Sequence, residues 1–284
     1  MLIGHKQTIK DLKKLADSGR LSHGYLFYGP AMVGKRAVAL SFANYLENGE
    51  FAPPKLLQDC FFAAPEGGTL GIDKVRELKN FLWQKPNVSK RRAAIVDQAE
   101  TMTQEAQNAI LRIAEEPPAS TVLMLITSDP ESILPTLLSR LHKMYFSPVG
   151  EEEIEKWLES DLKIKKSEAA KLAKSSLGKP GLAHALLHNE RLGDYLKSAE
   201  KLLKLPEGKR RDFIKEIIAP EDFSFSEFLD AVALVLTGDA ASESPRLRQG
   251  SGGQARLWHK LLALRQRTAN FPLNPRLQLE NLLS

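Results

Sequence analysis

The sequence has little of what secreted and membrane-embedded proteins depend on. It contains one cysteine, Cys60, so it can form neither an intrachain disulfide nor a zinc site built from several cysteines. It has no run of about 18 apolar residues, and its first residues show neither a long apolar core nor a cleavage site. We therefore expect a protein of the reducing cytoplasm that is neither secreted nor membrane-spanning.

The composition excludes an unfolded chain. The 284 residues are 43% hydrophobic and 26% charged, which is ordinary for a folded protein of two or three domains. The net charge of +5 favours an anionic partner only weakly, because a small cationic excess is also common in proteins that never bind nucleic acid.

The strongest chemical signal is a glycine-rich loop between an apolar segment, residues 25–28, and a helix-forming segment, residues 37–40. The loop reads Gly-Pro-Ala-Met-Val-Gly-Lys-Arg over residues 29–36. Such loops bind phosphate through backbone N–H groups at a helix start, and the lysine adds a positive charge. We predict that Gly29, Gly34 and Lys35 hold a phosphate; the alternative is a turn that binds no ligand.

Arg36 departs from this motif. The motif places Ser or Thr there, and its hydroxyl ligates Mg²⁺. A guanidinium is always cationic and cannot ligate a metal. The loop therefore keeps the means to hold a phosphate and lacks a group that holds the metal.

A second signal stands at the end of a predicted buried strand, residues 91–96. Asp97 follows this strand, where a carboxylate faces the nucleotide and meets Mg²⁺ in parallel-sheet proteins. ATPases of this arrangement place next a glutamate that polarises water, but here Gln98 cannot take a proton. The alternative interpretation is that Asp97 caps the helix that begins near Thr103.

The hydrophobic spacing predicts further elements along the chain. Strands are expected over residues 61–64 and 121–128, the latter ending in Thr127 and Ser128. Residues 193–284 are almost entirely of helical pattern. Helices are expected over residues 7–16, 37–46, 151–158, 167–177 and 182–188, and from residue 71 onward.

Two histidines have a spacing that could bind a metal. His184 and His188 lie four residues apart, but no third ligand is in view, so we predict no metal site.

Four segments resemble a known family in their order and spacing. They read RLSHGYLFYGPAMVGKR (20–36), IVDQAETMTQEAQNAILRIAEEPP (95–118), LITSDPESILPTLLSRL (125–141) and SLGKPGLAHALL (176–187). The resemblance is to the bacterial clamp-loader AAA+ family, and within it to the delta prime group of DNA polymerase III subunits. It implies an α/β AAA+ domain with a parallel sheet over residues 1–148, a small helical lid over 149–192 and an all-α collar for oligomerisation over 193–284.

The resemblance also implies roles for single residues. Gly29, Gly34 and Lys35 take the Walker A place, Asp97 takes the Walker B place, and Thr127 or Ser128 takes the sensor 1 place. Arg140 stands where the family offers an arginine finger to the nucleotide site of a neighbouring subunit.

Several departures from the family pattern argue against hydrolysis by this chain. Besides Arg36 and Gln98, Leu141 replaces the motif cysteine, Gly181 stands where active members carry the sensor 2 arginine, and the four-cysteine zinc module is absent. The resemblance thus implies a non-hydrolysing subunit with no certain cofactor beyond weakly bound ATP or ADP. The alternative is an autonomous or tau/gamma-like loader ATPase with an atypical metal site.

The resemblance further implies partners. They are tau/gamma and delta subunits in a hetero-oligomeric ring and, through that assembly, the sliding clamp and primer-template DNA. Residues 246–276 hold seven Arg or Lys and no acid, which indicates either a contact surface for an anion or a solvated helix face.

Overall fold

The computed structural model describes residues 2–66, 68–118, 120–220, 223–242, 257, 260, 261, 263, 264 and 274–283. The chain divides into two compact units, Met1–Gly181 and Leu182–Ser284, each of which is described by itself. The three-domain division at residues 148 and 192 stays a prediction. Of the cations in the basic segment 246–276, the structure describes Lys260 and Arg276, and the other five lie outside the described residues.

A five-stranded parallel sheet forms the centre of the first unit. Its spatial order is β2 (Cys60–Ala63), β3 (Arg92–Val96), β4 (Thr121–Thr127), β1 (Gly24–Tyr28) and β5 (His142–Tyr145). Tyr28 pairs with Thr127 on one side and with Tyr145 on the other, so these strands end in register. Because the strands are parallel, the segments that follow β1, β3 and β4 meet at one edge of the sheet. We call this the carboxyl edge.

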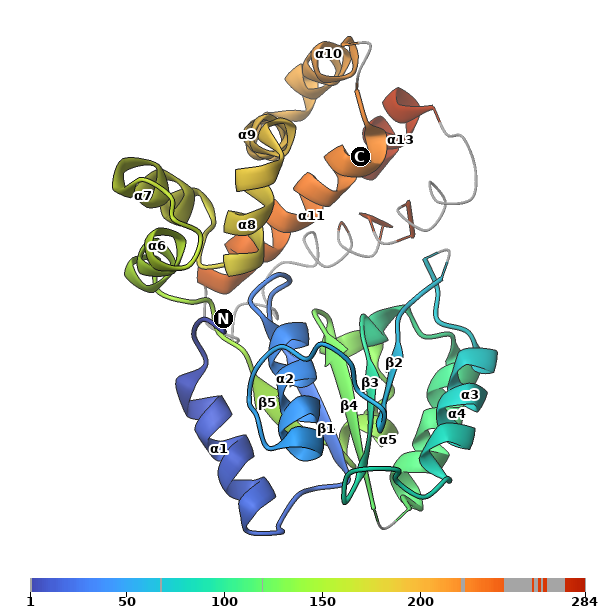
Figure 1. Ribbon diagram of the computed structural model, residues 1–284. Helices are drawn as coiled ribbons and strands as arrows, with labels where there is room; N and C mark the ends of the chain where they lie inside the picture. The colour runs from blue at the N-terminus through green and yellow to red at the C-terminus, as the bar shows by residue number, and fades with distance from the viewer. Residues whose placement is uncertain are drawn as a thin grey trace. The chain divides into compact units, whose positions relative to one another are not determined.

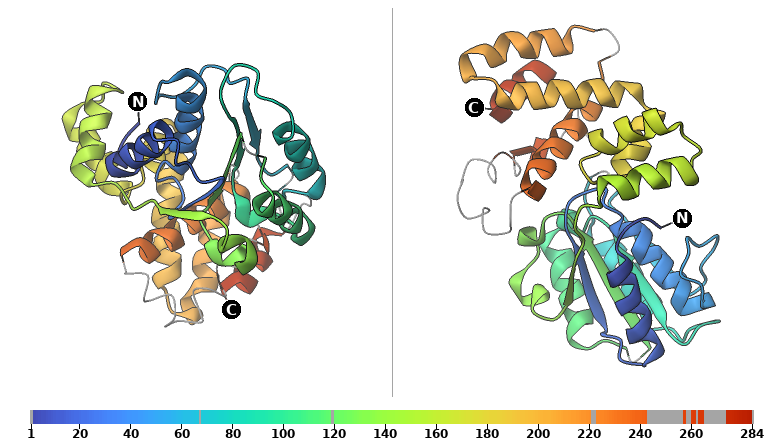
Figure 2. Two further views of the ribbon diagram at one scale, coloured as in Figure 1. Left: turned by 90° about the horizontal axis from the view of Figure 1, so that it is seen from below. Right: turned by 90° about the vertical axis from the view of Figure 1, so that its left-hand side faces the viewer.

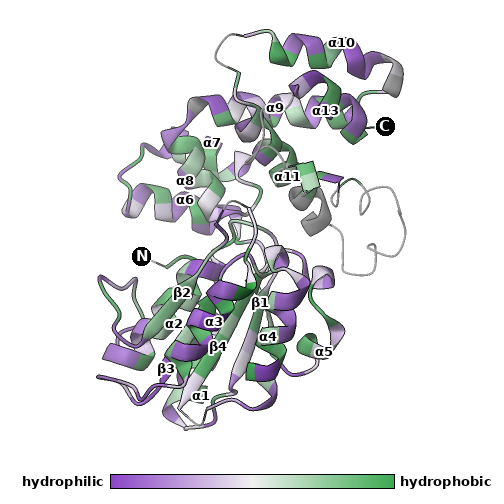
Figure 3. Cartoon of the chain, turned by 90° about the vertical axis from the view of Figure 1, so that its right-hand side faces the viewer, coloured by the Kyte–Doolittle hydropathy of each residue, from purple (hydrophilic) through white to green (hydrophobic). Residues whose placement is uncertain are grey.

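Helices cover both faces of the sheet (Figures 1 and 2). α1 (Lys6–Asp17) and α2 (Lys35–Asn48) lie on one face, and α3 (Ile72–Leu82), α4 (Gln104–Glu115) and the short α5 (Pro135–Leu138) lie on the other. Alternate strand residues enter the two cores: Phe27 packs with α1 and α2, whereas Leu26 packs with α3 and α4. Both faces are therefore apolar, as the green strands of Figure 3 show.

Two 3₁₀ turns and two further helices complete the first unit. The turn η1 (Ala99–Thr101) follows β3, and η2 (Pro130–Ser132) follows β4. The helices α6 (Glu151–Ser160) and α7 (Lys166–Ser175) pack on each other after β5.

The second unit is helical in its described part. α8 (Pro180–His188) leads into it from the last residues of the first unit and is followed by α9 (Glu190–Lys204), α10 (Glu207–Ile218), α11 (Phe225–Ser242) and α13 (Pro275–Leu283). α9 packs on α11 and α10 on α13, around a core that includes Ala199, Phe228, Val232 and Leu279. No helix in the described residues is long and apolar enough to cross a membrane.

The α/β fold predicted from the sequence is confirmed, and one strand was missed. The helices predicted over residues 7–16, 37–46, 151–158, 167–177 and 182–188 correspond to α1, α2, α6, α7 and α8, with ends that agree within two residues. β5 was not predicted because three of its four residues are exposed and the strand is partly polar, so it lacks the apolar pattern of a buried strand.

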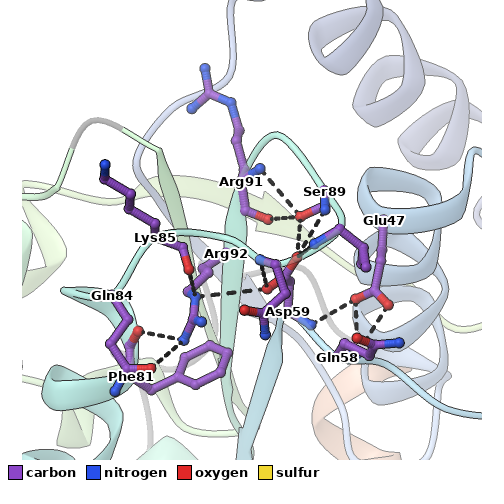
Figure 4. Close-up of polar contacts among 11 residues, drawn as sticks. Glu47, Gln58, Asp59, Phe81, Gln84, Lys85, Ser89, Arg91 and Arg92 are labelled. Carbon is purple, nitrogen blue, oxygen red and sulfur yellow. Dashed lines mark hydrogen bonds and ion pairs between the residues drawn. The ribbon is translucent and has the colours of Figure 1, made fainter.

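A buried charge network fixes the loop that enters β3 (Figure 4). Asp59, 1% exposed, accepts hydrogen bonds from the backbone N–H groups of residues 87, 88 and 89 and from the Ser89 hydroxyl. The Arg92 guanidinium lies 3.7 Å from Asp59 and donates to the carbonyls of Lys85 and Phe81. Asp59 directly precedes β2 and Arg92 begins β3, and their partners lie between the end of α3 and β3, so this network orders the edge of the sheet opposite the carboxyl edge.

Candidate nucleotide site

The loop of residues 29–34 joins β1 to α2 at the carboxyl edge. Gly29 has φ 143° and Gly34 has φ 112°, backbone angles that side-chain-bearing residues rarely adopt. A Cβ at Gly29 would also overlap the carbonyl oxygen of Phe146. The two glycines that the motif singled out are therefore required by the shape of the loop.

Four carbonyls of this loop are engaged by groups from three parts of the first unit. Lys35 Nζ donates to the carbonyls of Gly29 at 2.7 Å and Pro30 at 2.6 Å. The Gly181 N–H donates to the Met32 carbonyl at 3.0 Å, and His5 Nε2 lies 2.8 Å from the Val33 carbonyl. With its carbonyls held in this way, the loop has a defined shape, and its backbone N–H groups are the ones suited to meet an anion.

Gly181 occupies the predicted sensor 2 place and packs directly against this loop. A Cβ at residue 181 would lie 3.0 Å from the Met32 carbonyl oxygen and 3.1 Å from the Met32 Cβ. An arginine would need the loop to shift. The absence of a side chain at residue 181 thus allows this last residue of the first unit to lie close to the loop.

Lys35 is a buried cation, 7% exposed. Burial lowers its pKa from 10.5 to about 8, and the negative charges of Glu100 and Asp97 oppose part of that shift. A phosphate placed on the loop would add negative charge and favour the ammonium form. The lysine is therefore suited to an anionic ligand.

Arg36 faces Asp97 at the carboxyl edge. Its Nη1 lies 3.7 Å from Asp97 Oδ2, and its guanidinium lies over the Phe62 ring, 4.6 Å from the ring centroid. Burial raises the pKa of Asp97 above its usual value, and the Arg36 charge and the hydrogen bond from the Gln98 N–H offset only part of this rise. Asp97, the predicted Walker B residue, thus lies next to the residue that follows Lys35, and that residue carries a guanidinium instead of a hydroxyl.

Asp97 is not the cap of α4. The Thr103 hydroxyl oxygen accepts the N–H of Ala106 at 3.2 Å and caps that helix itself. The capping interpretation of Asp97 is therefore wrong, and its carboxylate belongs to the carboxyl edge.

Ser128 and Thr127 have different surroundings. The Ser128 hydroxyl donates to Glu100 Oε1 at 2.5 Å, and its N–H donates to the same oxygen at 3.3 Å. The Thr127 hydroxyl oxygen instead accepts the N–H of Asp129 within its own turn. Of the two sensor 1 candidates, Ser128 is thus the one that contacts a charged side chain near Asp97, that of Glu100.

Glu100 is a site residue that the sequence interpretation missed. It lies in η1, three positions after Asp97, and its charge acts on both Lys35 and Asp97. A signal was present, because an acid within a few residues of the end of β3 can reach the carboxyl edge.

Arg140 lies apart from these residues. It follows α5 and precedes β5, whose first residue His142 pairs with Tyr25 near the start of β1. It is therefore at the edge of the sheet opposite the loop. Its Nη2 forms an ion pair with Glu115 at 2.9 Å, its Nη1 donates to the Thr136 carbonyl at 2.7 Å, and its side chain is 38% exposed.

Metal ligands do not gather elsewhere in the part of the chain that the structure describes. No group of three or more His, Cys, Asp or Glu side chains there is arranged to hold a metal ion. The rings of His184 and His188 on α8 lie against each other, with centroids 4.6 Å apart.

A family model described as "DNA polymerase III, delta subunit" matches residues 4–150, about half of the chain. The chain belongs to this family of clamp-loader AAA+ proteins. The match covers the sheet, the loop, Asp97 and Arg140.

Relatives with curated names agree with this family. The chain is 31% identical over 211 residues to the DNA polymerase III delta' subunit of Pseudomonas aeruginosa, covering 67% of this chain and 64% of that protein. It is 34% identical over 160 residues to the gamma/tau subunit of Mycobacterium tuberculosis, covering 51% of this chain and 28% of that protein. The chain thus spans less than two thirds of the length of these relatives.

Solved structures show the same architecture. A DNA polymerase III gamma-subunit-related protein from Thermotoga maritima aligns over 96% of this chain and 97% of its own, with a TM-score of 0.52 and 25% identity. The RuvB Holliday junction branch migration motor of the same organism aligns over 87% of this chain and 88% of its own, with a TM-score of 0.53 and 17% identity. The second likeness concerns the fold alone.

Proposed function

We propose that this chain is a non-hydrolysing subunit of a bacterial replicative clamp loader, similar to delta prime. The observation that carries the proposal is the Arg36 guanidinium beside Asp97. Phosphoryl transfer needs a metal held by a loop hydroxyl and a carboxylate, and a group that orients the attacking water. Here a fixed cation faces the carboxylate, and Gln98 follows it. The site keeps its phosphate-binding shape without the groups of catalysis.

We further propose that Arg140 acts on a neighbouring subunit. Its place at the edge opposite the loop separates it from its own site, which supports action in trans. A guanidinium supplied across an interface stabilises the charge that develops on the transferred phosphoryl group. The ion pair with Glu115 is partly exposed, so it holds the side chain only weakly, and a stronger anion can replace it.

The proposed partners follow from the relatives. Delta' and gamma/tau are named subunits of DNA polymerase III, and we infer that this chain joins tau/gamma and delta subunits in a ring. The sliding clamp and primer-template DNA would then be reached through the assembly.

ATP turnover by the purified chain tests the central part of this proposal. We expect none above background, with Lys35→Ala as the matched control. Robust turnover that Lys35→Ala abolishes would contradict it and favour the autonomous ATPase, in which Glu100 would have to replace the missing catalytic carboxylate.

A further inference from the structure

Glu100 brings a further negative charge to the carboxyl edge, beside Asp97 and Ser128. It reaches the end of β4 from η1, and Oε1 accepts both the hydroxyl and the N–H of Ser128. Its charge also acts on the Lys35 ammonium. One carboxylate thus accepts a hydroxyl at the carboxyl edge and, without forming an ion pair, acts through its charge on the nearby Lys35 ammonium.

The second oxygen of this carboxylate is buried and lacks a hydrogen-bond partner among the described atoms. Oε2 of Glu100 has essentially no exposed surface. A buried carboxylate oxygen without a donor is costly, and native proteins contain few of them. The position of Glu100 is therefore not explained by local hydrogen bonding alone. The contacts that hold the carboxylate at the site are the hydroxyl and the N–H of Ser128.

These surroundings are those of a terminal phosphate. In phosphate-binding loops the lysine contacts the outer phosphates, and Ser128 stands in the sensor 1 place of the family. In this chain the Ser128 hydroxyl already donates to a carboxylate. A terminal phosphate entering the same space would lose that hydroxyl and would meet a like charge in a poorly solvated site.

We propose that Glu100 is a built-in anion that occupies the place of the terminal phosphate, so that the site accepts a nucleoside diphosphate and disfavours the triphosphate. This inference rests on the proposed phosphate-binding role of the Lys35 loop. Its consequence for the loader is a subunit whose site does not change with the nucleotide cycle, because the anion is part of the chain.

Paired titrations of ADP and ATP test this role. The full chain is titrated with each nucleotide in EDTA by calorimetry, as wild type and as Glu100→Gln. The glutamine keeps the shape and an acceptor for Ser128 but removes the charge. We expect wild type to bind ADP at least about 10-fold more tightly than ATP, because one like charge acts in a site of low dielectric. Glu100→Gln should bring the two affinities together through tighter ATP binding.

Controls separate this role from others. Glu105→Gln removes an exposed acid in the first turn of α4 and should leave the ratio unchanged. Melting curves establish that Glu100→Gln folds; if it does not, the wild-type ratio decides alone.

Four results would overturn the proposal. They are equal wild-type affinities, a ratio unaltered by Glu100→Gln, weaker ATP binding in that variant, and no binding of either nucleotide at millimolar concentration. Any of these results would reject the role of Glu100, while the proposed role of Arg140 and the proposed absence of ATP hydrolysis would still be decided by their separate experiments.

Discussion

The Nη1 atom of Arg36 lies 3.7 Å from the Oδ2 atom of Asp97, so the guanidinium at the start of α2 faces the carboxylate that follows β3. These residues come from α2 and from the end of β3, which meet at the carboxyl edge. In the proposed function, this permanent charge stands in place of the Mg²⁺ that an ATPase would hold with the same carboxylate. Because the Arg36 side chain is 61% exposed, the pair contributes only about 0 to 1 kcal/mol to stability. Its main consequence concerns metal binding.

Magnesium should matter little to nucleotide binding by the wild-type chain. We expect the affinity for ADP, measured by calorimetry, to change by less than about 3-fold between Mg²⁺ and EDTA, since Arg36 competes with the cation for Asp97. Arg36→Thr restores a hydroxyl and should make binding dependent on Mg²⁺ by about 10-fold, still without turnover because Gln98 remains. Arg76→Thr, on the exposed face of α3, is the matched control. Strict dependence on Mg²⁺ in wild type would contradict this account.

Nucleotide binding should weaken as the pH rises above about 8. The pKa of Lys35 in the free protein is about 8, and a phosphate binds the ammonium form. The affinity for ADP is therefore highest below this pH and falls by up to about 10-fold per pH unit above it. Phosphate groups stay ionised throughout this range.

The matched variant for this pH dependence is Lys35→Arg, whose side chain keeps its charge. Its affinity for ADP, even if weaker, should be constant from pH 7 to pH 9. A wild-type affinity that is equally constant would show that the charge of Lys35 is not what holds the phosphate.

The buried network of Asp59 should be the most sensitive charged position in the sheet. Asp59→Ala leaves three backbone N–H groups and the buried Arg92 without their shared acceptor, although Arg92 keeps its bonds to the carbonyls of Lys85 and Phe81. We expect the free energy of unfolding in urea to fall by about 2 to 4 kcal/mol. Asp11→Ala, at an exposed position of α1, should change it by less than about 0.5 kcal/mol.

The pH dependence of that loss has a definite sign. Burial by itself raises the pKa of Asp59, but the hydrogen bonds from residues 87 to 89 outweigh it and bring the pKa below 3.8. A carboxylate whose pKa is lower in the folded protein than in the unfolded chain stabilises the fold at a pH above the unfolded-chain pKa. This stabilisation is lost as the pH falls through the pKa of the folded protein. The difference in the free energy of unfolding between wild type and Asp59→Ala should thus be largest at pH 7 and decrease below pH 3.8. A difference that grows in acid would contradict the network.

Much of the site could be predicted because its residues are adjacent in sequence to buried strands. Gly29 and Lys35 follow β1, Asp97 follows β3 and Ser128 follows β4, and parallel strands bring their carboxyl ends to one edge whatever the details of packing. Local glycine and strand patterns therefore suffice to assemble them.

The contacts of Glu100 and Arg140 depend on geometry that no local pattern encodes. Glu100 reaches Ser128 because the chain turns sharply at Gln98, which has the left-handed φ of 50°. The pairing of Arg140 with Glu115 joins the ends of α4 and α5 and requires those helices to pack together. Both contacts are set by tertiary structure, where sequence periodicity carries little information.

The most direct test of the proposed function is ATP hydrolysis by a reconstituted loader that contains Arg140→Ala, with clamp and primed DNA present. We expect hydrolysis at the neighbouring site that Arg140 serves to slow by about 10³-fold or more, in an assembly whose mass is unchanged. Glu115→Ala, which removes the ion-pair partner and leaves the guanidinium, should keep near wild-type turnover. Unchanged hydrolysis with Arg140→Ala in an intact assembly, or an equal loss with Glu115→Ala, would contradict the role of Arg140 in trans.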